Sequence, residues 1–235
     1  MKNINNFIIE KLKITSTTKV KQYKYIPKSL EELKELVQKI IKESDGNCNL
    51  NDIDTSQIYD MHNLFYFKGN EEIYNIKINE WNVSKVQNMS NMFVGCGNFN
   101  CDLSNWDVSH VKNMSGMFYH CTKFNSDISE WDVSKVKNMS DMFLGCKRFN
   151  QDLSKWNVSN VEQMTQMFRN CESFDGKGLS KWNVSNCTQM EYMFYKCKSF
   201  IENLEDWDIK EDTDIDNMFK YCQRLYKKPI WYSEE

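Results

Sequence analysis

Tryptophan recurs along this chain at a nearly constant spacing. Six tryptophans at positions 81, 106, 131, 156, 182 and 207 are separated by 25, 25, 25, 26 and 25 residues, and a seventh follows 24 residues later. Each of the first six tryptophans is followed by Val or Ile two residues later, by a Met-Phe pair eleven and twelve residues later, and by Cys fifteen residues later. One such unit cannot bury its own apolar residues, whereas stacked units can. The period therefore predicts a solenoid over residues 48–225, with one degenerate and six clear coils.

Within a unit the apolar residues are spaced by two, three and four, which favours short elements joined by turns. We expect Phe99 to Trp106 to form a short strand or an extended edge. In the segment from Asn113 to Cys121, two Met, a Phe and the Cys lie at i, i+3, i+4 and i+7, which predicts one or two helical turns. Asn or Asp follows each of these six Trp, with Ser two residues later in the first five, and such residues form Asx-type corners.

An open solenoid needs caps at both ends. Residues 28–47 are predicted to contain an amphipathic capping helix, which begins with a Ser29–Glu32 capping box. Residues 226–235 form the expected C-terminal cap. Residues 1–27 form a separate segment, with a possible helix over 3–14, that serves as a further cap or as a docking peptide. The residues expected to fold over the last coil are Tyr226, Ile230, Trp231 and Tyr232.

Composition and charge exclude several classes of protein. The net charge is -3 and the pI about 5.8, so a general affinity for nucleic acid is not supported. No stretch approaches the roughly 20 apolar residues of a membrane span. The first residues lack the apolar run of a secretory signal, so we expect a protein that is cytoplasmic as synthesised. The nine cysteines are then predicted to be free, and mostly buried, thiols.

No arrangement of residues in the sequence indicates catalysis or a cofactor. Close cysteine pairs such as CxxC, which zinc sites favour, do not occur. The three histidines, His62, His110 and His120, are not part of a Ser-His-Asp or Cys-His pattern. A Gly-rich phosphate loop is also missing. We therefore expect a protein that is not an enzyme and binds no metal or cofactor.

The repeated unit W-[DN]-V-S-x-V-x-N-M-S-x-M-F-x-x-C-x-x-F-N-x-D-[LI]-S resembles the BspA-type leucine-rich repeat over residues 53–225. The resemblance implies a curved, leucine-rich-repeat-like solenoid that functions in adhesion or protein binding without a cofactor. The segment Ile8–Val20 is similar to leaders on proteins of gut Bacteroidetes and their phages. That similarity implies a bacterial or phage protein. For a phage protein, association with a virion is one of the expected locations.

Two surface stripes are predicted at positions that vary while the repeat stays constant. The first lies mainly thirteen and fourteen residues after each Trp and is rich in Tyr and basic residues, as binding hot spots are. The second is basic through the middle coils. For each stripe, an ordinary solvated face is the alternative. The candidate partner-binding residues are Tyr119, His120, Leu144, Arg169, Tyr192, Tyr195 and Tyr221 in the first stripe, and Lys112, Lys135, Lys137 and Arg148 in the second.

These observations predict a non-enzymatic interaction module that binds a protein, or a glycan, across its repeat surface. The alternative is a structural component of a phage or another particle, docked through residues 1–27 or through the ends of the solenoid. The sequence leaves the oligomeric state open.

Overall fold

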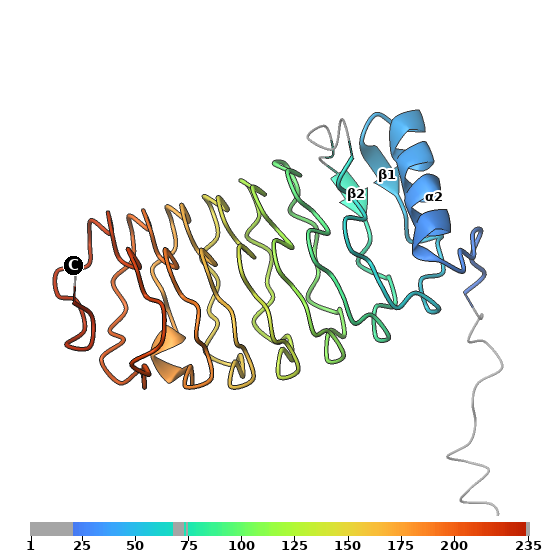
Figure 1. Ribbon diagram of the computed structural model, residues 1–235. Helices are drawn as coiled ribbons and strands as arrows, with labels where there is room; N and C mark the ends of the chain where they lie inside the picture. The colour runs from blue at the N-terminus through green and yellow to red at the C-terminus, as the bar shows by residue number, and fades with distance from the viewer. Residues whose placement is uncertain (1–20, 68–72, 74, 234–235) are drawn as a thin grey trace, which may run out of the picture.

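The computed structural model describes residues 21–67, 73 and 75–233, so the helix expected over residues 3–14 lies outside the described part of the chain. Beyond its few regular elements, the chain winds in successive turns that lie side by side (Figure 1). We call each turn, counted from one Trp to the next, a coil. The regular elements are helix α2 (Leu30–Glu43), strands β1 (Asn47–Asn49) and β2 (Asn75–Lys77), which pair in parallel, and the 3-10 helix η2 (Leu179–Lys181).

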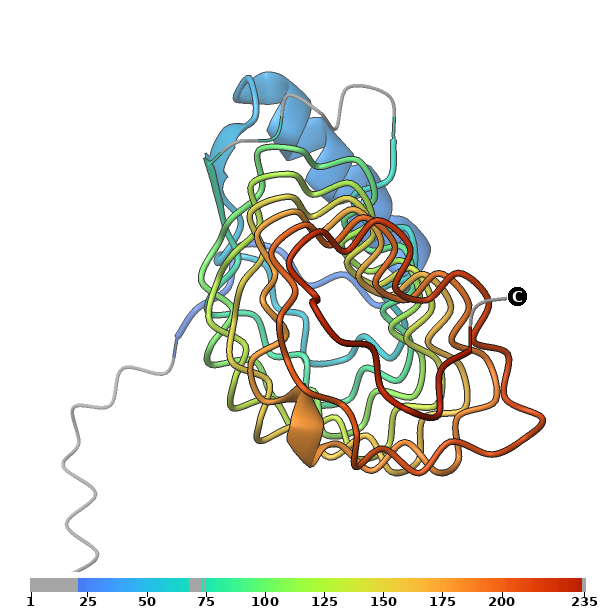
Figure 2. The same cartoon turned by 90° about the vertical axis from the view of Figure 1, so that its left-hand side faces the viewer.

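Equivalent residues of successive coils are neighbours in space. One isolated parallel bridge joins each coil to the next at the position seven residues after the Trp. Viewed along the stack, the coils lie behind one another (Figure 2). Each bridged residue pairs with the next one in the series Asp60, Asn88, Asn113, Asn138, Gln163, Gln189 and Asp214.

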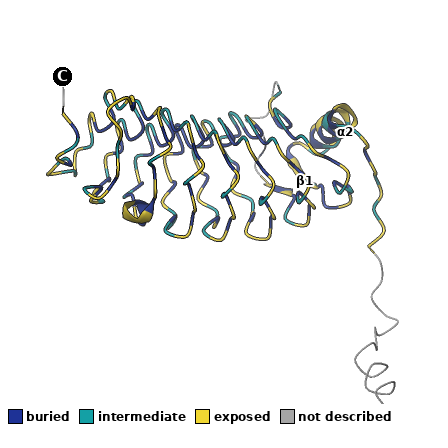
Figure 3. Ribbon diagram, turned by 60° about the horizontal axis from the view of Figure 1, so that its bottom comes forward, coloured by how far each residue is buried: buried dark blue, intermediate teal, exposed yellow. Residues whose placement is uncertain are grey.

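The repeated Trp, Met-Phe and Cys residues form the dry interior, as the period predicted, and almost all of them are buried (Figure 3). Phe143 shows how the ladder packs. Its ring centroid lies 5.7 Å from that of Phe118 and 5.5 Å from that of Phe168, the equivalent residues of the two adjacent coils. It also stacks on Phe149 of the same coil at 4.1 Å. Such ring pairs stabilise the interior beyond the burial of their area.

The polar atoms of the buried Trp and Cys side chains bond to backbone about 28 residues earlier in the chain. Trp156 Nε1 donates to the Ile128 carbonyl at 3.0 Å, and Cys146 Sγ donates to the Phe118 carbonyl at 3.0 Å. Burial raises the pKa of the Cys146 thiol well above its usual value, so the thiol stays protonated. All nine cysteines are free, and no cluster of three or more His, Cys, Asp or Glu residues within the described part could hold a metal.

The expected helical turns over Asn113 to Cys121 were wrong. We call the stretch from seven to fourteen residues after each Trp the turn segment. In this coil it contains Gly116 and His120 in the left-handed conformation, with φ of 61° and 58°. Its alternate N–H groups bond to the next coil instead of closing a helix. The donors are Met114, Gly116, Phe118 and His120, and the acceptors are the carbonyls of Asn138, Ser140, Met142 and Leu144.

The expected strand from Phe99 to Trp106 does not form either. Asp102 Oδ1 accepts hydrogen bonds from Ser104 N at 2.9 Å and from Ser104 Oγ at 2.7 Å, and these bonds turn the chain. The Trp106 N–H then donates to the Leu103 carbonyl within the same corner. Corners of this type recur in the other coils and leave no room for a strand.

These corners predict a dependence of stability on pH. The Ser154 N–H and hydroxyl and the Lys177 ammonium lower the pKa of Asp152 to about 2. Because the folded pKa lies below the unfolded value of about 3.9, this carboxylate stabilises the fold above pH 4 and ceases to do so as the pH falls toward 2. Urea unfolding should show Asp152→Asn to be less stable than wild type at pH 5, with the difference shrinking at pH 2. Asp208→Asn, at an exposed residue, serves as the control.

Helix α2 closes the first end of the stack. Ser29 Oγ accepts from the Glu32 N–H at 3.2 Å, and Glu32 Oε2 accepts from the Lys28 N–H at 2.8 Å. This reciprocal cap fixes the start of the helix. The helix buries Leu33, Val37 and other apolar residues of its inner face.

The C-terminal residues cover the last coil less fully than we expected. Trp231 continues the Trp ladder by donating from Nε1 to the Leu204 carbonyl at 2.9 Å, and Tyr232 is buried. Tyr226 and Ile230 are 95% and 83% exposed, so the expectation that they fold over the last coil was wrong. Only one ring fits at the Trp position of a coil, and Trp231 occupies it, so Tyr226 and Ile230 remain outside.

Candidate interaction surface

Every complete turn segment places two residues, ten and fourteen after the Trp, in the left-handed region of backbone space. Gly95 and Gly145 occupy the second position in two coils, where left-handed backbone costs little. His120, Lys196 and Tyr221 occupy the same position in other coils, with φ between 58° and 65°. The backbone of a bulky residue is strained in this conformation, and other coils of the same chain have glycine at this position. The strain therefore indicates that these side chains serve a purpose other than folding.

Arg169 lies against two tyrosine rings of the next coil. Its guanidinium carbon is 5.5 Å from the ring centroid of Tyr192 and 5.0 Å from that of Tyr195. The two rings meet edge to face at 5.6 Å. A guanidinium held over two aromatic faces gains cation–π stabilisation and loses conformational freedom.

The same pattern continues into the final coil. Tyr195 meets Tyr221 edge to face at 5.2 Å, and the Lys196 ammonium lies 5.3 Å and 5.8 Å from the two ring centroids. We call Arg169, Tyr192, Tyr195, Lys196 and Tyr221 the aromatic–cation column. It crosses three successive coils without a gap.

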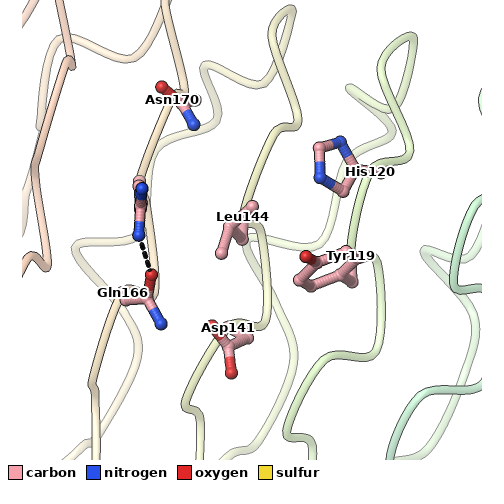
Figure 4. A pocket seen from close by; sticks show the side chains of 7 residues that line it. Tyr119, His120, Asp141, Leu144, Gln166 and Asn170 are labelled. Atoms are coloured by element: carbon pink, nitrogen blue, oxygen red, sulfur yellow. Dashed lines mark hydrogen bonds between the residues drawn. The ribbon is translucent and has the colours of Figure 1, made fainter.

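A hollow of about 340 Å³ adjoins the column. The side chain of Leu144, only 6% exposed, lies between the other lining residues (Figure 4). Tyr119 and His120 meet edge to face at 4.5 Å on one side. On the other side, Arg169 donates from Nη1 to Gln166 Oε1. The residues that line the hollow are Tyr119, His120, Asp141, Leu144, Gln166, Arg169 and Asn170.

Two titratable groups that line the hollow have pKa values shifted by their surroundings. Burial raises the pKa of Asp141, and the Glu191 charge adds to this effect, whereas Arg169 opposes it. Burial and the Lys147 charge lower the pKa of His120. Arg169 Nε and Glu191 Oε2 are buried without a hydrogen-bond partner among the described residues. Each such atom carries a desolvation cost that a bound polar group could offset.

The structure brings the candidates of the first stripe together. Tyr119, His120, Leu144 and Arg169 line the hollow, and Tyr192, Tyr195 and Tyr221 continue from it. The sequence reasoning missed Asp141 and Gln166. Both stand ten residues after a Trp, the variable position that also holds Tyr192, so comparing that position between coils could have found them.

The second stripe is spread over separate positions of the coil. Lys112 and Lys137 stand six residues after a Trp, where Lys112 Nζ donates to Gln87 Oε1 at 3.0 Å and Lys137 pairs with Glu162 at 2.9 Å. Lys135 stands two residues earlier, and Arg148 stands seventeen residues after its Trp, beyond the turn segment. The structure therefore gives this stripe no common surface feature.

The fold and this surface define a repeat protein that displays a continuous row of tyrosine and cationic side chains. Residues 31–143 and 125–231 each match a family described as Mycoplasma protein of unknown function, DUF285. The chain belongs to this family. The match shows that the BspA-type leucine-rich-repeat identification, which rested on the repeated motif over residues 53–225, was wrong. No curated protein and no solved structure matches the chain.

Within the described residues, no helix combines the length and the apolar character needed to cross a bilayer.

Proposed function

We propose that the chain is a solenoid scaffold without catalytic activity, which binds a protein partner along the aromatic–cation column and the adjoining hollow. The observation that carries this proposal is the placement of Arg169 over Tyr192 and Tyr195, in a row that continues to Tyr221.

The chemistry of the column is suited to protein recognition. Tyr and Arg are enriched among the residues that dominate binding energy. Because these side chains already contact one another, binding costs little additional rotamer entropy. The column and hollow also span successive coils, and a partner can therefore contact several of them at once, as is usual for repeat proteins.

The hollow favours one protruding side chain of the partner. Its volume is close to the lower end of the range for ligand sites, about 300 Å³. Leu144 offers an apolar surface, and Arg169 offers guanidinium donors at the wall. Asp141 also lines the hollow, so a side chain that both donates and accepts hydrogen bonds is the favoured occupant.

A triple variant tests the column. Tyr119→Ser, Arg169→Glu and Tyr195→Ser together should weaken partner binding at least about 100-fold, since each removes a residue of the hot-spot type. The partner would first be captured with the wild-type chain from cells that encode it, and the dissociation constants would then be measured with the purified partner.

The matched control carries Lys85→Ser, Lys135→Ser and Arg148→Glu, three surface changes away from the column, and should bind like wild type. Equal binding by the triple variant and the control would contradict the proposal. If a glycan is captured instead of a protein, and the triple variant loses it to the same extent, the proposed binding surface is right but the proposed protein partner is wrong.

A further inference from the structure

Within the part of the chain that the structure describes, the final coil ends in a row of backbone donors without acceptors. In each of the five preceding coils, four alternate N–H groups of the turn segment donate to carbonyls of the next coil. In the coil of Trp182, the donors are Met190, Tyr192, Phe194 and Lys196, at 2.7, 2.8, 3.0 and 2.9 Å from their acceptors. The equivalent N–H groups of the final coil have no acceptor among the residues that the structure describes. They belong to Ile215, Asn217, Phe219 and Tyr221.

The two ends of the stack are therefore finished differently. At the first end, α2 lies across the coils, and its own N–H groups are used within the helix (Figure 1). At the last end, Tyr232 covers the Phe219 ring at 5.0 Å, but Tyr221 remains 56% exposed. The apolar core is thus covered, and Phe219 with it, while Ile215, Asn217 and Tyr221 remain at least partly exposed along the backbone edge. An open row of N–H groups is a template for another polypeptide.

At two positions along this edge, the neutral polar side chains of the earlier coils are replaced by acidic ones toward the end of the stack. The bridged position holds Asn or Gln in every complete coil before the last, and Asp214 in the last. Two residues further on, Ser or Thr stands in the first four complete coils, followed by Glu191 and then Asp216. Asp214 and Asp216 are both exposed. A neutral neighbour can donate a hydrogen bond to such a carboxylate, as Asn88 Nδ2 does to Asp60 Oδ2 at 3.4 Å. A cationic neighbour is in addition attracted by the two negative charges, whereas an acidic neighbour is repelled.

We propose that the turn segment of the final coil binds a basic segment of a partner polypeptide. Backbone carbonyls of that segment accept hydrogen bonds from the N–H groups of Ile215, Asn217 and Tyr221, and the segment further covers the buried N–H group of Phe219. Lys or Arg side chains of the segment pair with Asp214 and Asp216. The donor row supplies affinity for backbone, and the two carboxylates select for positive charge.

A synthetic peptide serves as the probe. It has the sequence of residues 107–122, which form the equivalent surface of an inner coil, with the substitutions N113K and S115K at the positions that stack on Asp214 and Asp216. Added to the full chain, it should slow hydrogen exchange at the four N–H groups at least about tenfold at saturation, because a hydrogen-bonded amide exchanges only when the bond opens.

Variants of the chain test the charge selection. Asp214→Asn with Asp216→Asn should weaken peptide binding at least about tenfold, and the wild-type affinity should fall as salt is raised. Asp206→Asn with Asp208→Asn removes the same charge from the exposed residues on either side of Trp207 and should bind the peptide like wild type. Equal unfolding midpoints for the two variants would show that both fold.

Unchanged exchange at the four amides with excess peptide would overturn the proposal, as would equal peptide affinity in the two variants. If the Asp214 and Asp216 variant instead self-associates, and neither chain binds the peptide, the carboxylates only guard the edge against other copies and the proposal is wrong. The column variant, Tyr119→Ser with Arg169→Glu and Tyr195→Ser, should still bind the peptide, so this test stands apart from that of the proposed function.

Discussion

Replacing Phe143 with alanine is expected to destabilise the protein by about 3–5 kcal/mol, the usual cost of removing a fully buried aromatic ring. The ring is fully buried and packs on Phe118, Phe149 and Phe168 in three successive coils. Its loss opens a cavity in the middle of the ladder, where the adjacent coils hold the walls apart. Urea unfolding followed by circular dichroism measures the effect.

Lys135→Ala in the same coil is the control, since Lys135 is exposed, and its free energy of unfolding should change by less than about 0.5 kcal/mol. A loss below 1 kcal/mol for Phe143→Ala would contradict the description of the interior as one close-packed ladder. It would indicate that the coils can close up around the missing ring.

Gly178→Ala is the second change with a large expected effect, about 2–3 kcal/mol of destabilisation. Gly178 has a φ of 90°, a conformation that residues with a side chain rarely adopt. A Cβ there would lie 2.5 Å from Ser154 N and 2.7 Å from Ser154 Cα. Because both are backbone atoms of the preceding coil, the two coils would have to move apart. Thermal and urea unfolding both report this loss.

Gly116→Ala is the matched comparison and should cost only about 1 kcal/mol. Gly116 has a φ of 61°, but its added Cβ would meet the side chain of Asn91, which is exposed and can turn away. Asp141 and Gln166 already adopt the same backbone conformation in sister coils. An equal loss for the two glycine variants would show that backbone conformation alone, and not the contact with Ser154, decides the cost at Gly178.

The composition of the interior could be predicted because burial follows from the repeat itself. An apolar residue that returns at the same place in six units has to lie at one depth in all of them. This reasoning identified Trp156, Phe143 and Cys146 as core residues before any coordinates were considered. The start of α2 was equally accessible, since the Ser29–Glu32 cap involves groups within one helical turn.

The backbone conformation of the turn segment could not be predicted in the same way. Its spacing of i, i+3 and i+4 is that of a helix, and an isolated segment would have no better use for its N–H groups. Once stacked, Met114 and Gly116 donate to carbonyls of the next coil, and the left-handed conformations of Gly116 and His120 make this possible. The local pattern and the tertiary hydrogen bonds therefore favoured different conformations, and the tertiary bonds were decisive.

Which residues are buried and which positions vary on the surface could be predicted from the sequence, because both follow from comparing one unit with the next. Tyr119, Arg169 and Tyr195 could be proposed as neighbours on that basis. The tertiary structure was needed to show how these side chains meet, that Asp141 and Gln166 join them, and that the donors of the last coil lack acceptors among the described residues. Each of those features depends on contacts between residues about 25 positions apart, and such distances are set by the stacking of whole coils and not by any single unit.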